Sequence, residues 1–554
     1  MVQARANTQA SQPARRRESR LAWIGFLFAL LVRVCIAAGG HSGQNDAPRY
    51  GDFEAQRHWM EITVQQPLQQ WYRVSEDWWR LDYPPLSAFF AYLLGCLFDA
   101  FEATRFFVAW ETSRGADTPE TRALMRLSVL VADLVVMMTG LYAFSKSSNS
   151  SSKNINTWAT LLALVSPPLL LIDHGHFQYN CVALGLMVWA AWCLRTDTAR
   201  QIDQQTQRTG QRKSHRDLPL MCLGAACFAA ALLFKQMLLH VALPFFVLLL
   251  SRCFHRRSFA DGVTRLTAVG ATVIVVFVVS FWPWLRADWH VFKQSFRAEG
   301  AGQHVSLSES QVAQVLRRLF PFWRGLYEDK VANFWCSSNL VIKWRERFDK
   351  AVLRQLSTGA TLVFSLPSLL PLWRSPTTHH FLHSLLATSL AFFLFGYHVH
   401  EKTVLIAVTC AHLLLLSRST HATLRRWLAQ CLLPAAALSL FPLLRRDGQF
   451  YGYLGSLLVL AALLLLSPYR RTWVDYAVWS ACSAVHLYDW LAPVSPRFPH
   501  IALYLFSLVP FAVLAATWLL TTLLVCAPSS KVTRLVLTLL ESGSGSASSE
   551  RKLQ

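Results

Sequence analysis

Long apolar segments separated by short polar ones dominate the chain. Runs of roughly 20 nearly uncharged residues recur, and a helix of about that length crosses the hydrocarbon core of a bilayer. The pattern predicts an all-α polytopic membrane protein with about fourteen transmembrane helices. We expect them over residues 21–39, 122–144, 156–173, 180–194, 218–234, 237–251, 264–283, 357–373, 381–397, 403–417, 426–444, 452–467, 473–491 and 501–526.

The basic residues indicate on which side of the membrane each loop lies. The chain carries a formal net charge of +21, and much of its Lys and Arg lies in alternate loops, as expected when positive loops stay cytoplasmic. Topology therefore explains the charge, and no nucleic acid partner is expected. The tails, 1–20 and 527–554, are then both cytoplasmic, the second a flexible polar end. Arg445 and Arg446 are the clear exception, because they fall on the opposite side.

A cleaved signal peptide is the alternative for the first apolar segment. A basic head precedes it, as in a signal peptide, but its apolar core at 21–39 is long for one. We therefore expect this segment to be the first transmembrane helix.

Five polar clusters fall on the non-cytoplasmic side of this arrangement. The first runs from Arg49 to Pro85 and is rich in charged and aromatic residues. Charged residues are costly to place in hydrocarbon and mark functional sites in membrane proteins. Their convergence on one face predicts a polar pocket at the membrane surface, with the first cluster as the reaction centre. The other four clusters are 173–180, 234–237, 284–356 and 398–402.

Asp52 opens the first cluster, just after the first apolar segment. Residues 53–66 predict a short amphipathic helix, which Pro67 ends because proline cannot continue a helix. Spacings of four and three residues place three polar side chains on one face of it. They are Glu54, His58 and Glu61.

Asp82 closes the first cluster, in the turn LDYPP. Tyr83 is expected to be extended because proline follows it. Proline is well tolerated at the start of a helix, so a second helix is expected over about 84–101.

Six stretches carry a family resemblance. They are GDFEAQRHWMEIT (51–63), LDYPPL (81–86), LIDHGHFQYN (171–180), FKQM (234–237), RLFPFWRGLYEDKVANFWC (318–336) and HVHEK (398–402). In these stretches the chain closely resembles the dolichyl phosphate glucose-dependent glucosyltransferases of the endoplasmic reticulum, which have the GT-C fold. The likeness extends from about residue 20 to residue 410. Beyond that point only membrane helices are recognisable.

The resemblance implies an inverting transfer of glucose from dolichyl phosphate glucose to a diphosphodolichol-linked oligosaccharide, with an alpha-1,3 bond as the product. It places the enzyme in the endoplasmic reticulum membrane with a lumenal active site. A GT-C catalytic module would occupy 21–410, with lumenal loops at 40–121 and 284–356, and further transmembrane helices would occupy 411–526.

Two branches of this family add the first and the second glucose. The strings EAQRHWME and EDKVAN are most like the enzyme that adds the first glucose to Man(9)GlcNAc(2)-diphosphodolichol, whereas GYHVHEK is nearer to the second. We expect the first-glucose enzyme and keep the second as the alternative.

Asp52 is the candidate catalytic base, because a carboxylate can take the proton of an acceptor hydroxyl and because Asp52 matches the aspartate that the family uses. The competing interpretation is that Asp52 caps the helix that follows it. The candidate donors to the leaving phosphate are cationic, although ordinary snorkelling of lysine to the membrane surface would also explain two of them. They are Lys235, His400 and Lys402.

Further candidates would contact the acceptor or sugar, or order the loops over the site. Local pairing, or a solvated charged face, is the alternative for each. They are Glu54, Arg57, His58, Asp82, Tyr83, His176, Gln178, Arg324, Glu328 and Asp329.

Other classes of chemistry have little support in the sequence. The twelve cysteines form no CxxC pair, so neither a disulfide scaffold nor a zinc site is indicated. Asp52 and Glu54 alone are too short a signal for a divalent cation, and no glycine-rich phosphate loop points to a nucleotide-sugar donor. We therefore predict no metal and no cofactor, with the two dolichol-linked substrates and membrane lipid as partners and no obligate protein partner.

A transporter and a mannosyltransferase are the competing functions. Many spans would suit a transporter, but transporters place their polar sites near the midplane of the membrane, whereas these clusters gather outside one face. A related enzyme of different sugar or acceptor, such as a mannosyltransferase, would share Asp52 and differ in its pocket.

Overall fold

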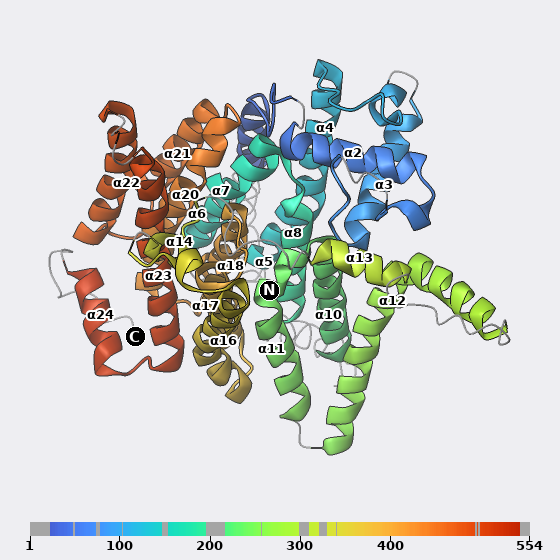
Figure 1. Ribbon diagram of the computed structural model, residues 1–554. Coiled ribbons are helices and arrows are strands. Elements are labelled where there is room, and N and C mark those ends of the chain that lie inside the picture. Colours follow the sequence, from blue (N-terminus) through green and yellow to red (C-terminus); the bar gives the residue numbers. More distant parts are fainter. Residues whose placement is uncertain are drawn as a thin grey trace, which may run out of the picture.

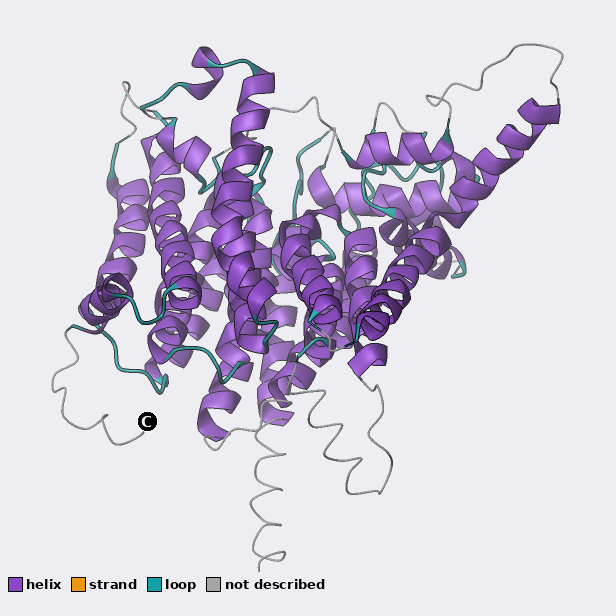
Figure 2. Ribbon diagram, turned by 90° about the horizontal axis from the view of Figure 1, so that it is seen from below, coloured by secondary structure: helices purple, strands orange, loops and turns teal. Residues whose placement is uncertain are grey.

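The fold is described from a computed structural model. It describes residues 23–47, 50–73, 78–101, 104–146, 153–195, 217–255, 258–297, 310–320, 330–339, 341–493, 496 and 499–542. Three of the candidate residues lie outside these ranges, namely Arg324, Glu328 and Asp329. Throughout the described ranges the ordered elements are helices, and no β-strand occurs (Figure 2).

A helix occupies each of the predicted apolar segments (Figure 1). These helices are Trp23–Ala37, α4 (Pro119–Ala132) with η3 (Asp133–Met138) and α5 (Thr139–Lys146), α6 (Lys153–Leu164) with α7 (Pro167–Leu170) and η4 (Leu171–Phe177), α8 (Asn180–Cys193), α10 (Asp217–Phe234), η5 (Gln236–Val241) with α11 (Ala242–Phe254), α12 (Phe259–Arg297), α16 (Lys350–Arg374), α17 (Thr378–Phe395), α18 (Val404–Leu416), α19 (Ala422–Trp427) with η8 (Leu428–Leu432) and α20 (Leu433–Arg446), α21 (Phe450–Leu465), α22 (Trp473–Leu491) and α23 (Ile501–Cys526).

Within the described part of the chain, eight helices are long and apolar enough to cross a membrane. Four more apolar helices are shorter. The all-α membrane fold is thereby confirmed, while the count of fourteen spans stays a prediction.

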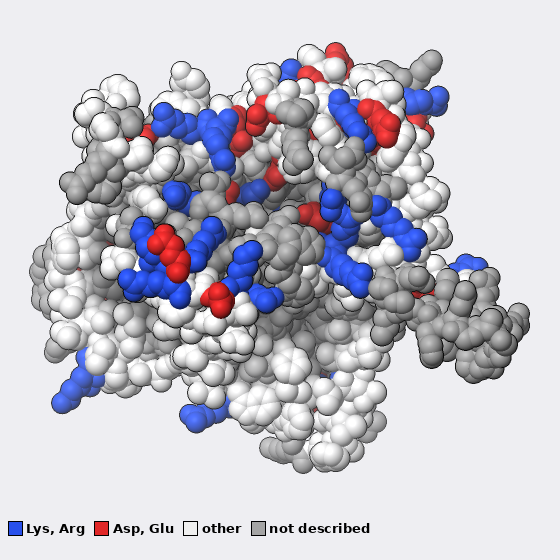
Figure 3. Space-filling model, viewed as in Figure 1, with Lys and Arg blue, Asp and Glu red and all other residues white. Residues whose placement is uncertain are grey.

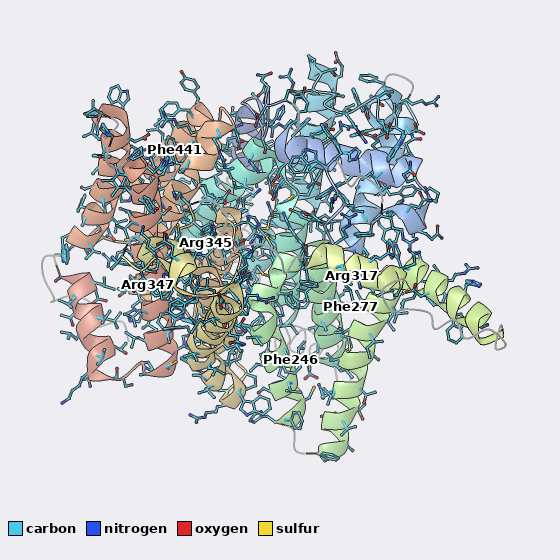
Figure 4. The ribbon with its side chains drawn as sticks, viewed as in Figure 1. Phe246, Phe277, Arg317, Arg345, Arg347 and Phe441 are labelled. Atoms are coloured by element: carbon cyan, nitrogen blue, oxygen red, sulfur yellow. The ribbon has the colours of Figure 1, made fainter. Side chains whose placement is uncertain are left out.

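Large apolar side chains face outward where the bundle would meet lipid. Phe246 on α11 and Phe277 on α12 are 62% and 38% exposed (Figure 4). Lys and Arg are sparse over this lower part of the surface and dense around the hollow above it (Figure 3). An apolar belt below a charged rim is the surface that a bilayer stabilises.

The most deeply buried helices come from the C-terminal part of the chain. All residues of α18 are buried. In the helical span Ala422–Arg446, which contains α20, 94% of the apolar stretch is buried. These helices therefore form the centre of the bundle.

Two short helices cover one end of the bundle. They are α2 (Gly51–Gln65) and α3 (Pro85–Asp99), close to the helices expected from the sequence. Gly95 allows them to approach, because a Cβ at this position would meet the Val64 side chain at 2.6 Å and the Met60 carbonyl at 2.9 Å.

The segment 284–356 contains more helix than its polar composition suggests. α12 continues past the end of the apolar run to Arg297. Three short helices follow, α13 (Gln311–Leu319), α14 (Phe334–Ser338) and α15 (Trp344–Arg347). Ser310 caps α13 by accepting from the Ala313 amide, which satisfies a backbone donor at the helix start.

The C-terminal tail also differs from the expectation of a flexible polar end. It contains α24 (Lys531–Glu541), which Ser530 caps by accepting from the Thr533 amide. Its apolar side chains pack on the core, and the Arg426 guanidinium donates to the Leu540 carbonyl at 2.6 Å.

Candidate active site

Asp52 lies at the centre of a polar cluster drawn from three distant parts of the chain. Its Oδ2 accepts from Lys402 Nζ at 2.6 Å and from the amide of Gln178, and it lies 3.0 Å from His176 Nε2. The Asp52 side chain is 26% exposed. It therefore has several donors on one side and access to solvent on the other.

Asp52 does not cap the helix that contains it. The helix α2 begins one residue earlier, Tyr50 occupies the cap position, and no side chain caps the helix start. The Asp52 amide donates instead to Ser42 Oγ at 3.0 Å. The carboxylate is thus free of the structural role that competed with catalysis.

Charge decides the ionisation of Asp52. Burial raises the pKa of this carboxyl, but Lys402 and His176 outweigh it and hold the pKa well below its usual range. Burial likewise opposes the charge of Lys402, while Asp52 and Glu401 raise its pKa above the ordinary value. The two groups therefore form an ion pair at neutral pH.

His176 bridges Asp52 to a second carboxylate that the sequence analysis missed. Its Nδ1 lies 2.6 Å from Oδ2 of Asp447, in the turn between α20 and α21. One feature of the sequence could have drawn attention to Asp447. It directly follows Arg445 and Arg446, the basic pair that falls on the non-cytoplasmic side of the predicted topology.

The turn that carries His176 is held in place by hydrogen bonds from the Arg126 side chain to backbone carbonyls. η4 is a π-helical turn, and Phe177 has φ of 86°, a left-handed conformation that costs energy in a residue other than glycine. Arg126 donates to the carbonyls of His174, Gly175 and Gly40. This buried guanidinium, also missed in the sequence, fixes the η4 turn against the end of the first apolar helix.

Lys235 lies beside the same cluster. Its Nζ donates to Gln178 Oε1 at 2.8 Å and to Asn180 Oδ1 at 2.6 Å, and it lies 4.7 Å from the ring centre of Tyr83. Burial lowers its pKa to about 8, against the pull of Asp173. Lys235 is therefore a buried cation that orients Gln178 toward Asp52, whereas the sequence analysis placed it at the membrane surface.

Asp82 and His400 contact residues that lie near members of the Asp52 cluster in the sequence. The Asp82 carbonyl accepts from the Gln236 amide at 3.2 Å, and burial together with Asp52 and Asp82 raises the pKa of Tyr83 well above its ordinary value. His400 precedes Lys402 by two residues and its ring lies 4.9 Å from that of His398. Both candidates thus lie within the segments that carry the cluster.

Glu54, Arg57 and His58 belong to a separate buried network. Arg57 is 1% exposed and donates to Glu54 at 2.6 and 2.7 Å, to Glu61 at 2.8 Å and to the Phe107 carbonyl at 2.6 Å. His58 Nδ1 lies 3.1 Å from Glu61. These contacts bind α2 to the loop that follows α3, and a contact of these residues with sugar stays a prediction.

A groove opens beside the catalytic cluster. Its volume is about 520 Å³, and it begins at residues adjacent to Lys402 and Asp447. Apolar side chains of α20 and α23 form one wall, with Phe441 of α20 visible in Figure 4. The groove is lined by Lys330, Glu401, Ser439, Phe441, Pro442, Leu443, Arg445, Arg446, Asp489, Leu503 and Phe506.

Asp52 is an ionised, partly exposed carboxylate among cationic side chains in a helical membrane protein. This arrangement is that of a membrane enzyme which uses a carboxylate as a base. The comparison with known families agrees with this class. The model of the ALG6, ALG8 glycosyltransferase family matches residues 29–542, so the chain belongs to that family and is a membrane glycosyltransferase. The transporter alternative is wrong.

Three relatives give the scale of the similarity. The dolichyl pyrophosphate Man9GlcNAc2 alpha-1,3-glucosyltransferases of Gallus gallus and Saccharomyces cerevisiae are each 36% identical to the chain, over 78% and 79% of it and 75% and 73% of their own lengths. The probable enzyme of that name from Caenorhabditis elegans is 34% identical over 87% of the chain and 85% of its own length. The similarity therefore extends well past residue 410, where the sequence analysis ended it.

Proposed function

We propose that the protein transfers the first glucose from dolichyl phosphate glucose to Man(9)GlcNAc(2)-diphosphodolichol, with inversion, at the lumenal face of the endoplasmic reticulum membrane. The observation that carries this proposal is the position of Asp52, a partly exposed carboxylate at which segments 51–63, 171–180 and 398–402 meet. The relatives named above support the acceptor, since their names specify Man9GlcNAc2.

The residues at the centre perform two tasks in this reaction. Asp52 takes the proton of the acceptor hydroxyl as its oxygen attacks C1 of the glucose from the face opposite the phosphate. The bond from C1 to the phosphate oxygen breaks and the phosphate leaves with the electron pair. We propose that Lys402 and His400 stabilise that developing charge, because charge-assisted hydrogen bonds to phosphate are strong.

The groove supports a lipid phosphate as the donor. Lys330 and Arg446 contribute positive charge and Phe441 and Leu503 apolar wall. Two acidic residues also line the groove, Glu401 and Asp489, and Asp489 pairs with Arg445 at 2.7 Å. A polyprenyl phosphate combines the same two properties, since it joins an anionic group to a hydrocarbon chain. Glu401, one of the lining residues, directly precedes Lys402 in the chain, so a phosphate bound in the groove would lie close to the segment that carries Lys402.

The experiment uses the purified full-length protein in lipid nanodiscs with labelled dolichyl phosphate glucose. Acceptors bearing no glucose and one glucose are supplied in separate reactions, and the products are separated by size. We expect label on the first acceptor and none on the second. Label on the glucosylated acceptor alone would instead identify the second-glucose enzyme, and label on neither would overturn the proposal.

A further inference from the structure

Asp447 is buried where His176 meets the catalytic carboxylate. The Asp447 and His176 side chains are 5% and 2% exposed, and the 2.6 Å separation of Asp447 Oδ2 from His176 Nδ1 is shorter than the 3.0 Å separation of His176 Nε2 from Asp52. A buried carboxylate is expensive unless it is paired. His176 is the partner that makes this position tolerable for Asp447.

The two carboxylates determine which ring nitrogens of His176 carry a proton. A carboxylate oxygen only accepts, so a ring nitrogen that bonds to it must carry a proton. Because both ring nitrogens face carboxylates, the imidazolium form satisfies both contacts at once. In that form the 3.3 Å approach of Lys402 Nζ to His176 Nε2 is a contact between two donors and gives no hydrogen bond.

Two side chains of this cluster are buried and two are exposed enough for a substrate to reach them. His176 and Asp447 are closed off, whereas Asp52 and Lys402 are 26% and 20% exposed. Lys402 belongs to the same short segment as Glu401, which lines the groove. Because Lys402 is partly exposed and His176 is not, an anionic group that approaches the cluster can contact Lys402 but not His176.

The turn that carries Asp447 packs against the end of the first apolar helix. Gln449 Nε2 donates to the Gly40 carbonyl at 2.5 Å and to the Ile36 carbonyl at 3.2 Å. Gly40 lies so close to the Asp447 carbonyl that a Cβ would collide with it. The position of Asp447 is thus set by the backbone around it.

We propose that Asp447 is a positioning residue for the glucosyl transfer, holding His176 against Asp52 while Lys402 moves from the Asp52 carboxylate to the phosphate of the donor. This inference rests on the function proposed above. While Lys402 is paired with Asp52, the carboxylate is ionised but weakly basic. When Lys402 turns to the phosphate, Asp52 loses one cation and becomes a stronger base, and His176 still fixes its orientation. Asp447 contacts no substrate and takes no proton.

The test is Asp447→Asn in the labelled transfer assay, with kcat expressed per molecule of folded protein. We expect kcat to fall by about 100-fold, the usual effect of displacing a catalytic group by about 1 Å, with KM for the donor unchanged. Asp447→Glu, which keeps the charge, should recover part of kcat. The matched control is Asp475→Asn, since Asp475 is also a buried carboxylate of the C-terminal region, 1% exposed and paired with Arg426 at 2.9 Å, and it lies outside the site. It should keep the wild-type kcat.

The double variant Asp447→Asn with His176→Gln keeps the test valid if the single variant does not fold, because it leaves no unpaired buried charge. Its kcat should equal that of His176→Gln alone, since residues that act through one contact are not additive. A lower kcat in the double variant, an unchanged kcat in Asp447→Asn, or an equal loss in Asp475→Asn would each overturn the inference. Absence of transfer by the wild-type protein would instead overturn the proposed function.

Discussion

At the scale of single residues, the first prediction concerns the Asp52 carboxylate. Replacing Asp52 with Asn removes the group that accepts the acceptor proton while keeping its shape. We expect kcat to fall by about 100-fold or more, the contribution of a general base. Binding of the donor, measured by quenching of tryptophan fluorescence, should persist. Near-normal turnover in this variant would exclude Asp52 as the base.

The Lys402 side chain gives a prediction about pH. Lys402 holds the pKa of Asp52 well below its usual range, so in the free wild-type enzyme Asp52 stays ionised down to acid pH. In Lys402→Met that attraction is lost and the pKa of Asp52 rises. The acid limb of kcat/KM should therefore move to higher pH, and KM for the donor should rise. The pH dependence of transfer between pH 4 and 8 is the measurement, with Lys350→Met as the control, because Lys350 is exposed at the start of α16. An unmoved acid limb would contradict the ion pair as the cause.

For single residues, the sequence predicted members of the candidate site where the residue type and its motif indicate a chemical role. Asp52, His176, Gln178, Lys235 and Lys402 were all named from their motifs, and the structure brings them together. Asp447 was missed because its role depends on a contact across 271 positions of the chain, which no local pattern contains. The role of each residue stays a prediction until turnover is measured.

At the scale of elements, α2 is held by a buried network centred on Arg57. Spacings of four and three residues place Glu54, His58 and Glu61 on one face, as the sequence predicted, and the structure adds Arg57 to that face through its ion pairs with Glu54 and Glu61. That face is turned inward, although a charged face on a short helix is usually solvated. The reason is that Arg57 also satisfies the Phe107 carbonyl and Ser113, so the charges are paired within the protein.

Removing Arg57 should therefore destabilise this part of the fold. Arg57→Leu leaves Glu54 and Glu61 buried without their cation, and breaking a buried ion pair costs about 3–5 kcal/mol. We expect a lower Tm in detergent and faster hydrogen exchange over residues 104–113. Arg105→Leu is the matched control, since Arg105 is 67% exposed and its pair with Asp99 is long at 3.7 Å, and exposed pairs contribute about 1 kcal/mol or less. Equal effects of the two variants would refute the structural role of the network.

Glu61 makes the same network sensitive to acid. Burial opposes its charge, but His58 and Arg57 outweigh burial and lower its pKa to about 2, from an ordinary value of 4.5. Its contribution to stability is therefore complete above about pH 4.5 and is lost as the pH falls toward 2. In Glu61→Gln the decrease of Tm over that interval should be smaller than in the wild type. Thermal unfolding at a series of pH values measures the difference, and parallel curves would contradict it.

For the whole molecule, hydropathy predicted where the apolar helices lie but not how the helices pack. The apolar runs of α18 and α20 have no distinguishing sequence feature, yet they form the buried centre, and the turn after α20 contributes to the active site. Packing between distant helices is a long-range property, so a chain read in windows of about 20 residues does not contain it. For the same reason the sequence analysis ended the catalytic module at residue 410 and did not foresee that Asp447, in the turn after α20, lies 2.6 Å from His176 of the candidate site.

The shared location of Asp52 and Asp447 leads to a prediction about topology. Tyr451, at the first turn of α21, is 83% exposed and lies near Asp447, and Arg470 is exposed beyond the other end of the same helix. In a protein whose exposed Cys35 and Cys526 are replaced by Ser, Tyr451→Cys should react with a membrane-impermeant maleimide only after sealed microsomes are opened. Arg470→Cys should react in intact microsomes, because the loop after α21 is expected on the cytoplasmic side. Labelling of Tyr451→Cys in intact microsomes would place the Asp447 turn, and with it Asp52, on the cytoplasmic side, where the proposed lumenal transfer cannot occur.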